Sequence, residues 1–174
     1  MVDDRILWGL RFLVYKIWTG RLRGFGYIGQ PIFFVGKRRF YADDGLGIFP
    51  GARIEILDGK MQVGKNVRIG HGLFVSCASM LTIGDYVTMS ANVFISTTEN
   101  KVEMGALSPF SQWPVIELPV EIGNNCFIGY GAAILPGTKL GDGSIVGANA
   151  VVRGQHPPGS IIAPAKTTNI GSRV

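Results

Sequence analysis

The sequence predicts an all-β fold in which short parallel strands wind into a solenoid, preceded by one amphipathic helix. Two observations support this prediction. An aliphatic residue recurs every six positions over most of the chain from residue 48, and glycine is frequent, with 25 of 174 residues. Hydrophobic residues make up 47% of the chain and charged residues 17%, which excludes an intrinsically disordered protein. A chain of this length can bury the core of one domain.

The six-residue repeat is clearest in three blocks that begin at residues 63, 83 and 122, with two weaker units at 48 and 54. A strand alternates faces every two residues, so the first and fifth positions of each unit can both point inward, whereas a helix loses this register. Stacked units then bury one aliphatic column, as in β-solenoids. Cys126 falls at a fifth position and is predicted to be a small core residue. The aliphatic first positions are Val63, Ile69, Val75, Ile83, Met89, Ile95, Ile122, Ile128, Ile134, Leu140, Val146 and Val152.

The charge divides the chain into two parts. Residues 1–41 carry eight Lys/Arg and two Asp, a net +6, whereas residues 42–174 carry nine Lys/Arg and ten Asp/Glu, a net −1. We therefore predict a basic amphipathic segment at 1–41 and a repeat domain with a C-terminal tail at 42–174. A basic end suits anionic lipid or glycan. No nucleic-acid motif accompanies it, and we expect no nucleic-acid partner.

The segment from residue 3 to 24 has the pattern of an amphipathic helix. Ile6, Leu10, Leu13, Val14 and Ile17 recur at spacings of three and four. Interspersed arginines and a lysine argue against a transmembrane span, and the acidic start argues against a signal peptide. Two interpretations stay open. The helix packs against its own domain or a neighbouring subunit, or it lies on a membrane surface with its tryptophans near the headgroups.

The hexapeptides resemble those of the hexapeptide-repeat acyltransferases, whose fold is a left-handed parallel β-helix with three hexapeptides in each triangular coil. The resemblance covers roughly residues 45–170 and implies four to five coils. The long loop near 99–119 and two later stretches are similar to the branch of sugar and polysaccharide O-acetyltransferases. These stretches are PVEIGNNCFIGYGAAILPGTKLGDGSIVGANAVV and PPGSIIAPAK. The resemblance implies acetyl-CoA as donor and a homotrimer with active sites between the coils of two subunits.

The repeat breaks at ISTTENKVEMG, residues 95–105. In the resembling family a histidine at the end of the hexapeptide before the loop is the catalytic base, and here Asn100 holds that position. Asparagine is no base at neutral pH, although it can donate a hydrogen bond to an oxyanion. The other catalytic candidates are His71, at an outward third position, and Glu99, whose carboxylate would need a raised pKa to act as a base. A solvated surface histidine and a charge at the loop edge are the alternatives.

Further candidates surround the expected acceptor and donor. Cys77, Phe110 and Trp113 are candidates for binding the acceptor, Cys77 because it occupies an outward third position. The resemblance implies that the donor is bound by Gly129, Tyr130, Gly147, Ala148, Arg153 and Lys166. The chain departs from the family at IIAPAK, where one turn is shortened.

We expect no metal site, because the only two histidines, His71 and His156, lie far apart along the solenoid, whereas β-helical carbonic anhydrases hold zinc with three.

Three functions follow from these observations. The first is an acetyl-CoA-dependent O-acetyltransferase acting on a cell-surface polysaccharide or a lipid-linked glycan precursor. The second is an N-acetyltransferase for a nucleotide amino sugar, and the third is a non-catalytic hexapeptide protein that lacks the family histidine. Two cysteines without a CxxC pair indicate a reducing cytoplasm. The basic N-terminal segment adds the expectation of a peripheral position at the inner membrane.

Overall fold

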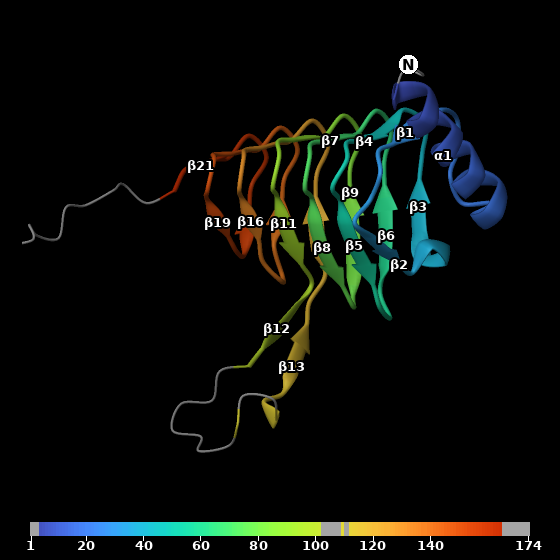
Figure 1. The fold of residues 1–174 in the computed structure, drawn as a ribbon. Helices are drawn as coiled ribbons and strands as arrows, with labels where there is room; N and C mark the ends of the chain where they lie inside the picture. Colours follow the sequence, from blue (N-terminus) through green and yellow to red (C-terminus); the bar gives the residue numbers. More distant parts are fainter. Residues whose placement is uncertain (1–3, 102–108, 110–111, 165–174) are drawn as a thin grey trace, which may run out of the picture.

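The structure, a computed structural model, describes residues 4–101, 109 and 112–164. One helix, α1 (Asp4–Thr19), lies against the end of a solenoid of short strands, and a hairpin leaves the solenoid near its middle (Figure 1). The hairpin consists of β12 (Thr98–Asn100) and β13 (Val115–Glu117), which pair antiparallel.

The solenoid strands form three parallel sheets, one for each side of the coil. Sheet I contains β1 (Gly26–Ile28), β4 (Leu46–Ile48), β7 (Arg68–Ile69), β10 (Thr88–Met89), β15 (Phe127–Ile128), β18 (Ile145–Val146) and β21 (Ile161–Ile162). Sheet II contains β2 (Phe33–Val35), β5 (Arg53–Ile56), β8 (Phe74–Cys77), β11 (Phe94–Ser96), β16 (Ala133–Ile134) and β19 (Val151–Val152). Sheet III contains β3 (Phe40–Ala42), β6 (Lys60–Val63), β9 (Met80–Ile83), β14 (Val120–Ile122), β17 (Lys139–Leu140) and β20 (Gln155–His156). A short 3-10 helix, η1 (Lys37–Arg39), precedes β3.

The core is the predicted aliphatic column. All twelve aliphatic first positions of the repeat are buried, and Cys126 is 2% exposed. Their strands stack in register from coil to coil, as in the pairing of Ile95 with Val75 and Ile134. The predicted fold class, an all-β parallel solenoid with one N-terminal helix, is therefore confirmed.

The predicted number of four to five coils is too low, because the three sheets hold about six turns. The first turn, residues 26–42, precedes the recognisable repeat, and its strands pair with β4, β5 and β6. Its buried side chains are Ile28, Phe40 and Ala42, and the half-buried Phe34 packs against the same core. Phe34 and Phe40 pair with Ile54 and Met61 of the next coil, so aromatic residues stand here where the repeat has aliphatic ones, and a pattern of aliphatic residues alone gives no signal. The solenoid thus begins inside the segment that the charge pattern sets apart.

Helix α1 packs on the first turn through its aromatic residues rather than through the predicted aliphatic stripe. Phe12 is buried in the core. The ring of Trp8 lies 6.0 Å from that of Tyr27, and the ring of Tyr15 lies 5.8 Å from that of Phe34. Trp8 is half-buried against aromatic side chains of the first turn, and the other interpretation, a helix on a membrane surface, stays a prediction. The helix does pack on its own domain, but its aliphatic stripe faces away.

Candidate functional site

The hairpin interrupts the corner between sheets II and III. In the other turns of the coil a short link joins the two sheets, whereas here the chain leaves after β11 and returns at β14. Figure 1 shows the hairpin projecting away from the stack of coils. The corner is therefore the one place where the described solenoid departs from its regular winding.

Thr97 anchors the base of the hairpin. Its side chain is fully buried, and its hydroxyl oxygen accepts hydrogen bonds from the backbone N–H groups of Ala78, at 2.9 Å, and Ser79, at 3.0 Å. Its carbonyl accepts a bond of 2.9 Å from the N–H of Leu118, where the chain returns. Thr97 is not among the residues that the repeat pattern singles out. A polar residue directly after a core strand at the break of the repeat was the available signal.

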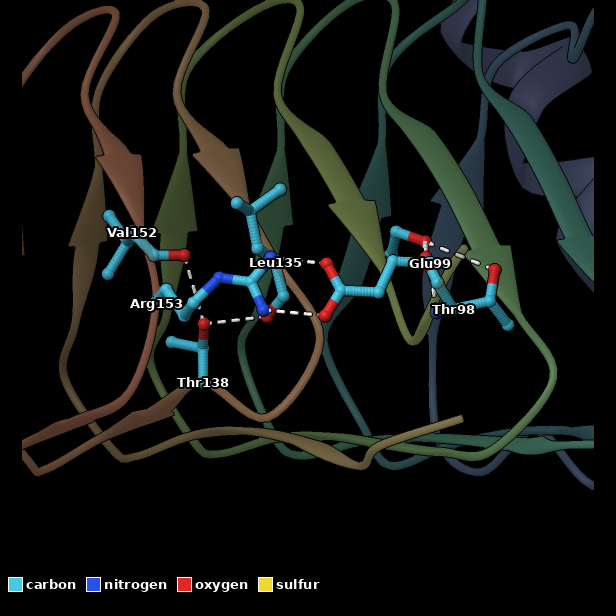
Figure 2. A network of polar contacts seen from close by, with 7 residues as sticks. Thr98, Glu99, Leu135, Thr138, Val152 and Arg153 are labelled. Carbon is cyan, nitrogen blue, oxygen red and sulfur yellow. Dashed lines mark hydrogen bonds and ion pairs between the residues drawn. The ribbon is translucent and has the colours of Figure 1, made fainter. Parts of the chain in front are cut away.

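Glu99 forms a two-pronged ion pair with Arg153 across the stack of coils. Arg153 Nη1 donates to Glu99 Oε1 at 2.6 Å, and Nη2 donates to Oε2. Figure 2 shows the guanidinium and the carboxylate facing each other, with Arg153 coming from the turn after β19. The hydrogen bonds from Arg153 lower the pKa of the Glu99 carboxyl below its usual value. A base would need the opposite shift, so this pairing does not favour Glu99 as the proton acceptor.

Asn100 is exposed at the end of β12 and pairs with Val115 of β13. Its amide can donate and accept hydrogen bonds without titrating. Trp113 is half-buried and lies two residues before β13 in the same hairpin. Phe110, the other aromatic candidate for the acceptor, lies outside the described residues.

His71 lies at a different corner, between sheets I and II. Its carbonyl accepts a 2.7 Å hydrogen bond from the N–H of Asn92, and the same ladder continues from Gly131 to Ala91 and from Asn149 to Tyr130. His71, Ala91, Tyr130 and Ala148 therefore form one outward row, as the repeat predicts. The His71 side chain is exposed, and its ring lies 5.1 Å from that of Phe49.

Tyr130 lies two coils from His71 in this row, about 10 Å away at the usual strand spacing. The small side chain of Ala91 lies between them in the row. The Tyr130 hydroxyl accepts a 2.9 Å hydrogen bond from Asn92 Nδ2, which fixes its orientation. The row thus combines an imidazole and a phenol on an exposed corner.

The close packing of successive coils explains why residues 129 and 147 are glycines. A Cβ at Gly129 would lie 2.6 Å from the backbone nitrogen of Ala148, and one at Gly147 would lie 3.2 Å from the carbonyl oxygen of Ile162. Both glycines permit the close stacking of the next turn. Lys166, the last donor-binding candidate, lies outside the described residues.

The prediction that Cys77 borders the acceptor cleft is wrong, because Cys77 is fully buried. Strand β8 is extended to four residues, and alternation turns both Val75 and Cys77 into the core. Its thiol lies 3.1 Å from the carbonyl oxygen of Ser79, and burial raises its pKa. The outward positions on this strand are Phe74 and Ser76.

The described candidates therefore form two groups at opposite edges of sheet II. One edge carries His71, Gly129, Tyr130, Gly147 and Ala148, in the turns that enter the sheet. The other carries Glu99, Asn100, Trp113 and Arg153, in and beside the turns that leave it. An outward aromatic ladder crosses the sheet between them, where the rings of Phe74 and Phe94 lie 5.3 Å apart. A single chain does not bring the two groups together.

Residues 119–154 match a family model described as bacterial transferase hexapeptide (six repeats). Among curated proteins, the chain is 32% identical over 145 residues to a serine acetyltransferase of Helicobacter pylori, covering 77% of this chain and 72% of that protein. It is 34% identical over 111 residues to WbbJ of Escherichia coli, an O-acetyl transferase whose name assigns it to lipopolysaccharide biosynthesis, covering 58% and 56%. The chain spans about half or less of the length of the first curated relatives that it matches.

The fold matches a crystal structure of AntD, an N-acyltransferase from Bacillus cereus, in complex with dTDP and coenzyme A. The TM-score is 0.72 at 17% identity, and the match covers 93% of this chain and 89% of AntD. At this identity the likeness shows the fold. The serine acetyltransferase match, in agreement with the family model, shows that this chain belongs to the hexapeptide-repeat transferases.

Proposed function

We propose that the protein is an acetyl-CoA-dependent O-acetyltransferase acting on a cell-surface polysaccharide or a lipid-linked glycan precursor. The single observation behind this proposal is the hairpin that breaks an otherwise regular coil and carries Asn100 out of it. The relatives add support, because they are named as acetyltransferases and WbbJ is named for lipopolysaccharide biosynthesis. We also propose that the protein acts in the cytoplasm, in keeping with its two free thiols.

The separation of the two residue groups supports a homotrimer. In a cyclic assembly with parallel solenoid axes, one edge of sheet II can meet the opposite edge in the next subunit. The hairpin and Arg153 of one copy would then lie beside the His71 row of its neighbour. The aromatic ladder of sheet II between these edges supplies apolar surface for such a contact.

Within this assembly we assign the proton acceptor to His71. Its exposed imidazole takes the proton from the acceptor hydroxyl as that oxygen bonds to the thioester carbonyl carbon. The carbon–sulfur bond then breaks, and the CoA thiolate receives the proton from the imidazole. Asn100 donates its amide N–H to the oxyanion that forms between these two events. Arg153 lies beside Asn100 at the same edge, where its charge is balanced by that of Glu99.

The donor is tested by thermal unfolding with and without acetyl-CoA, CoA and ATP as an anionic control. A ligand at about 100 times its Kd stabilises a protein by about 2.7 kcal/mol, so a specific donor raises the unfolding temperature by several degrees. Stabilisation by acetyl-CoA and CoA, and not by ATP, supports the proposal. Equal effects of all three, or none, contradict it.

An N-acetyltransferase for a nucleotide amino sugar is the second candidate, favoured by the fold match to AntD in complex with dTDP. An acceptor panel separates the two, because an O-acetyl product is an ester that alkaline hydroxylamine cleaves and an N-acetyl product is a stable amide. The proposal predicts ester products from glycans. Amide products formed only from nucleotide amino sugars favour the second candidate.

The third candidate is a binding scaffold without chemistry, favoured by asparagine at the family's histidine position. It predicts that donor binding persists while no acceptor of either kind is acetylated.

A further inference from the structure

Helix α1 carries apolar side chains on two opposite sides. Trp8, Phe12 and Tyr15 face the first turn of the solenoid. The opposite side, which we call the α1 outer face, is exposed along the whole helix. It consists of Ile6, Leu7, Leu10, Leu13, Val14, Ile17 and Trp18. Each of these side chains is about half exposed or more, up to 77% for Ile17.

The α1 outer face continues onto the segment that follows the helix. An apolar groove of about 320 Å³ runs between Leu10 and Leu13 on the helix and Phe25 beside it. Phe25 is 86% exposed. An apolar surface of this extent on one end of a soluble domain is typical of a contact site.

Cations flank this apolar surface on both sides. Lys16 donates to the carbonyl oxygen of Gly24 at 2.7 Å and lies over the Phe25 ring. Lys37 lies 5.6 Å from the centre of the Trp18 ring, with Arg38 beside it in the same shallow pocket. Long basic side chains next to tryptophan at the edge of an aliphatic strip are characteristic of helices that lie in a lipid interface.

The nearby acidic side chains cancel only part of this charge. Asp43 is paired with Arg23 at 3.6 Å and Asp58 with Arg39 at 3.4 Å, while Asp44 accepts the backbone N–H of Phe25. Residues 1–44, which include Asp43 and Asp44, carry eight Lys/Arg and four Asp and so still have a net charge of +4. Like charges oppose the docking of this end on the same end of a second copy, whereas an anionic surface attracts it.

We propose that the protein docks on anionic phospholipid membranes through the α1 outer face and Phe25. Helix α1 lies in the plane of the interface, because its outer face is exposed along the whole helix. No helix among the described residues is long and apolar enough to cross a membrane. Its aliphatic side chains enter the boundary between headgroups and acyl chains, and the flanking lysines and arginines meet the phosphates. The solenoid then stands with its first turn at the membrane. This inference concerns binding alone and stands apart from the proposed activity.

The test is flotation of the whole protein with two kinds of vesicle, phosphatidylcholine alone and phosphatidylcholine mixed with phosphatidylglycerol. No acyl donor is present, so the result does not depend on activity. We expect binding to the mixed vesicles that falls as salt rises, and at least tenfold weaker binding to the neutral ones. Ile17→Glu should reduce binding to the mixed vesicles at least tenfold.

Ile161→Glu is the matched control, since Ile161 is 78% exposed at the far end of the solenoid. It introduces the same charge at the same exposure and should bind mixed vesicles like the wild type. Circular dichroism of both variants checks that the fold is kept. Equal loss in both variants, or no wild-type binding to the mixed vesicles, overturns the proposal. A change of oligomeric state in Ile17→Glu alone, seen by sedimentation without vesicles, also overturns it, because a second copy would then cover this face.

Discussion

Different kinds of contact stabilise the regular coils of residues 122–162 and the corner at 97–119, where the repeat is interrupted. In the coils, one position in every six is aliphatic and buried, and neighbouring coils repeat the same contacts. At the corner the contacts are individual. Thr97 is a buried hydroxyl that holds two backbone N–H groups, and Glu99 reaches across the stack to Arg153. Stability is therefore expected to reside in the repeat, and chemistry in the place where the repeat stops.

The largest expected effect on stability comes from the coils. Ile134→Ala removes a fully buried side chain from β16, which β11 and β19 flank, and leaves a cavity. Such a change costs about 2–5 kcal/mol of the free energy of unfolding. Val151→Ala, on β19 with its side chain 68% exposed, should cost less than about 0.5 kcal/mol. Urea unfolding of both variants measures the difference, and equal losses would contradict the buried column.

Loss of the Thr97 hydroxyl, which anchors the hairpin, should lower the free energy of unfolding less than Ile134→Ala does. Thr97→Val keeps the shape of the side chain but leaves the N–H groups of Ala78 and Ser79 without their hydroxyl acceptor. We expect a loss of about 1–3 kcal/mol by urea unfolding. The same substitution at Thr88, which is exposed on β10, should change stability by less than about 0.5 kcal/mol. Comparable values for the two variants would show that the corner needs no polar anchor.

The ion pair should have the smallest effect on stability. A cycle of Glu99→Gln, Arg153→Gln and the double variant is expected to give a coupling of at most about 1 kcal/mol, because both side chains are partly exposed. Urea unfolding near neutral pH measures it. A coupling several times larger would mean that the pair holds the corner together.

The pH dependence of this coupling has a definite sign. Arg153 lowers the pKa of folded Glu99 below that of the unfolded chain, which is about 4.3 for glutamate. The ion pair therefore contributes its full stabilisation above the pKa of Glu99 in the unfolded chain. This stabilisation disappears as the pH falls through the lower pKa of Glu99 in the folded protein. Wild type should lose more stability than Glu99→Gln between about pH 5 and about pH 2. Parallel losses would show that the ion pair is absent in solution.

The sequence predicts the coils well because one residue type repeats at one period, and each turn confirms the register of the next. It fails at the first turn, where Phe34 and Phe40 replace the aliphatic pattern, and at Cys77, where a longer strand shifts the inward position by two residues. The sequence does not decide which face of α1 packs on the solenoid, because its aliphatic and aromatic sides both have helical spacing. The pairing of Glu99 with Arg153 joins residues 54 positions apart, and no local pattern encodes it.

Release of free thiol from acetyl-CoA, with a glycan acceptor, tests the central claim most directly. Wild type, His71→Ala, His156→Ala and Asn100→His are compared side by side. We predict acceptor-dependent release by wild type, a loss of roughly 10²–10⁴-fold in His71→Ala, as expected for removal of a general base, and an unchanged rate in His156→Ala. Release that is absent in wild type and appears only in Asn100→His would contradict the account, since the scaffold would then be complete but without its base.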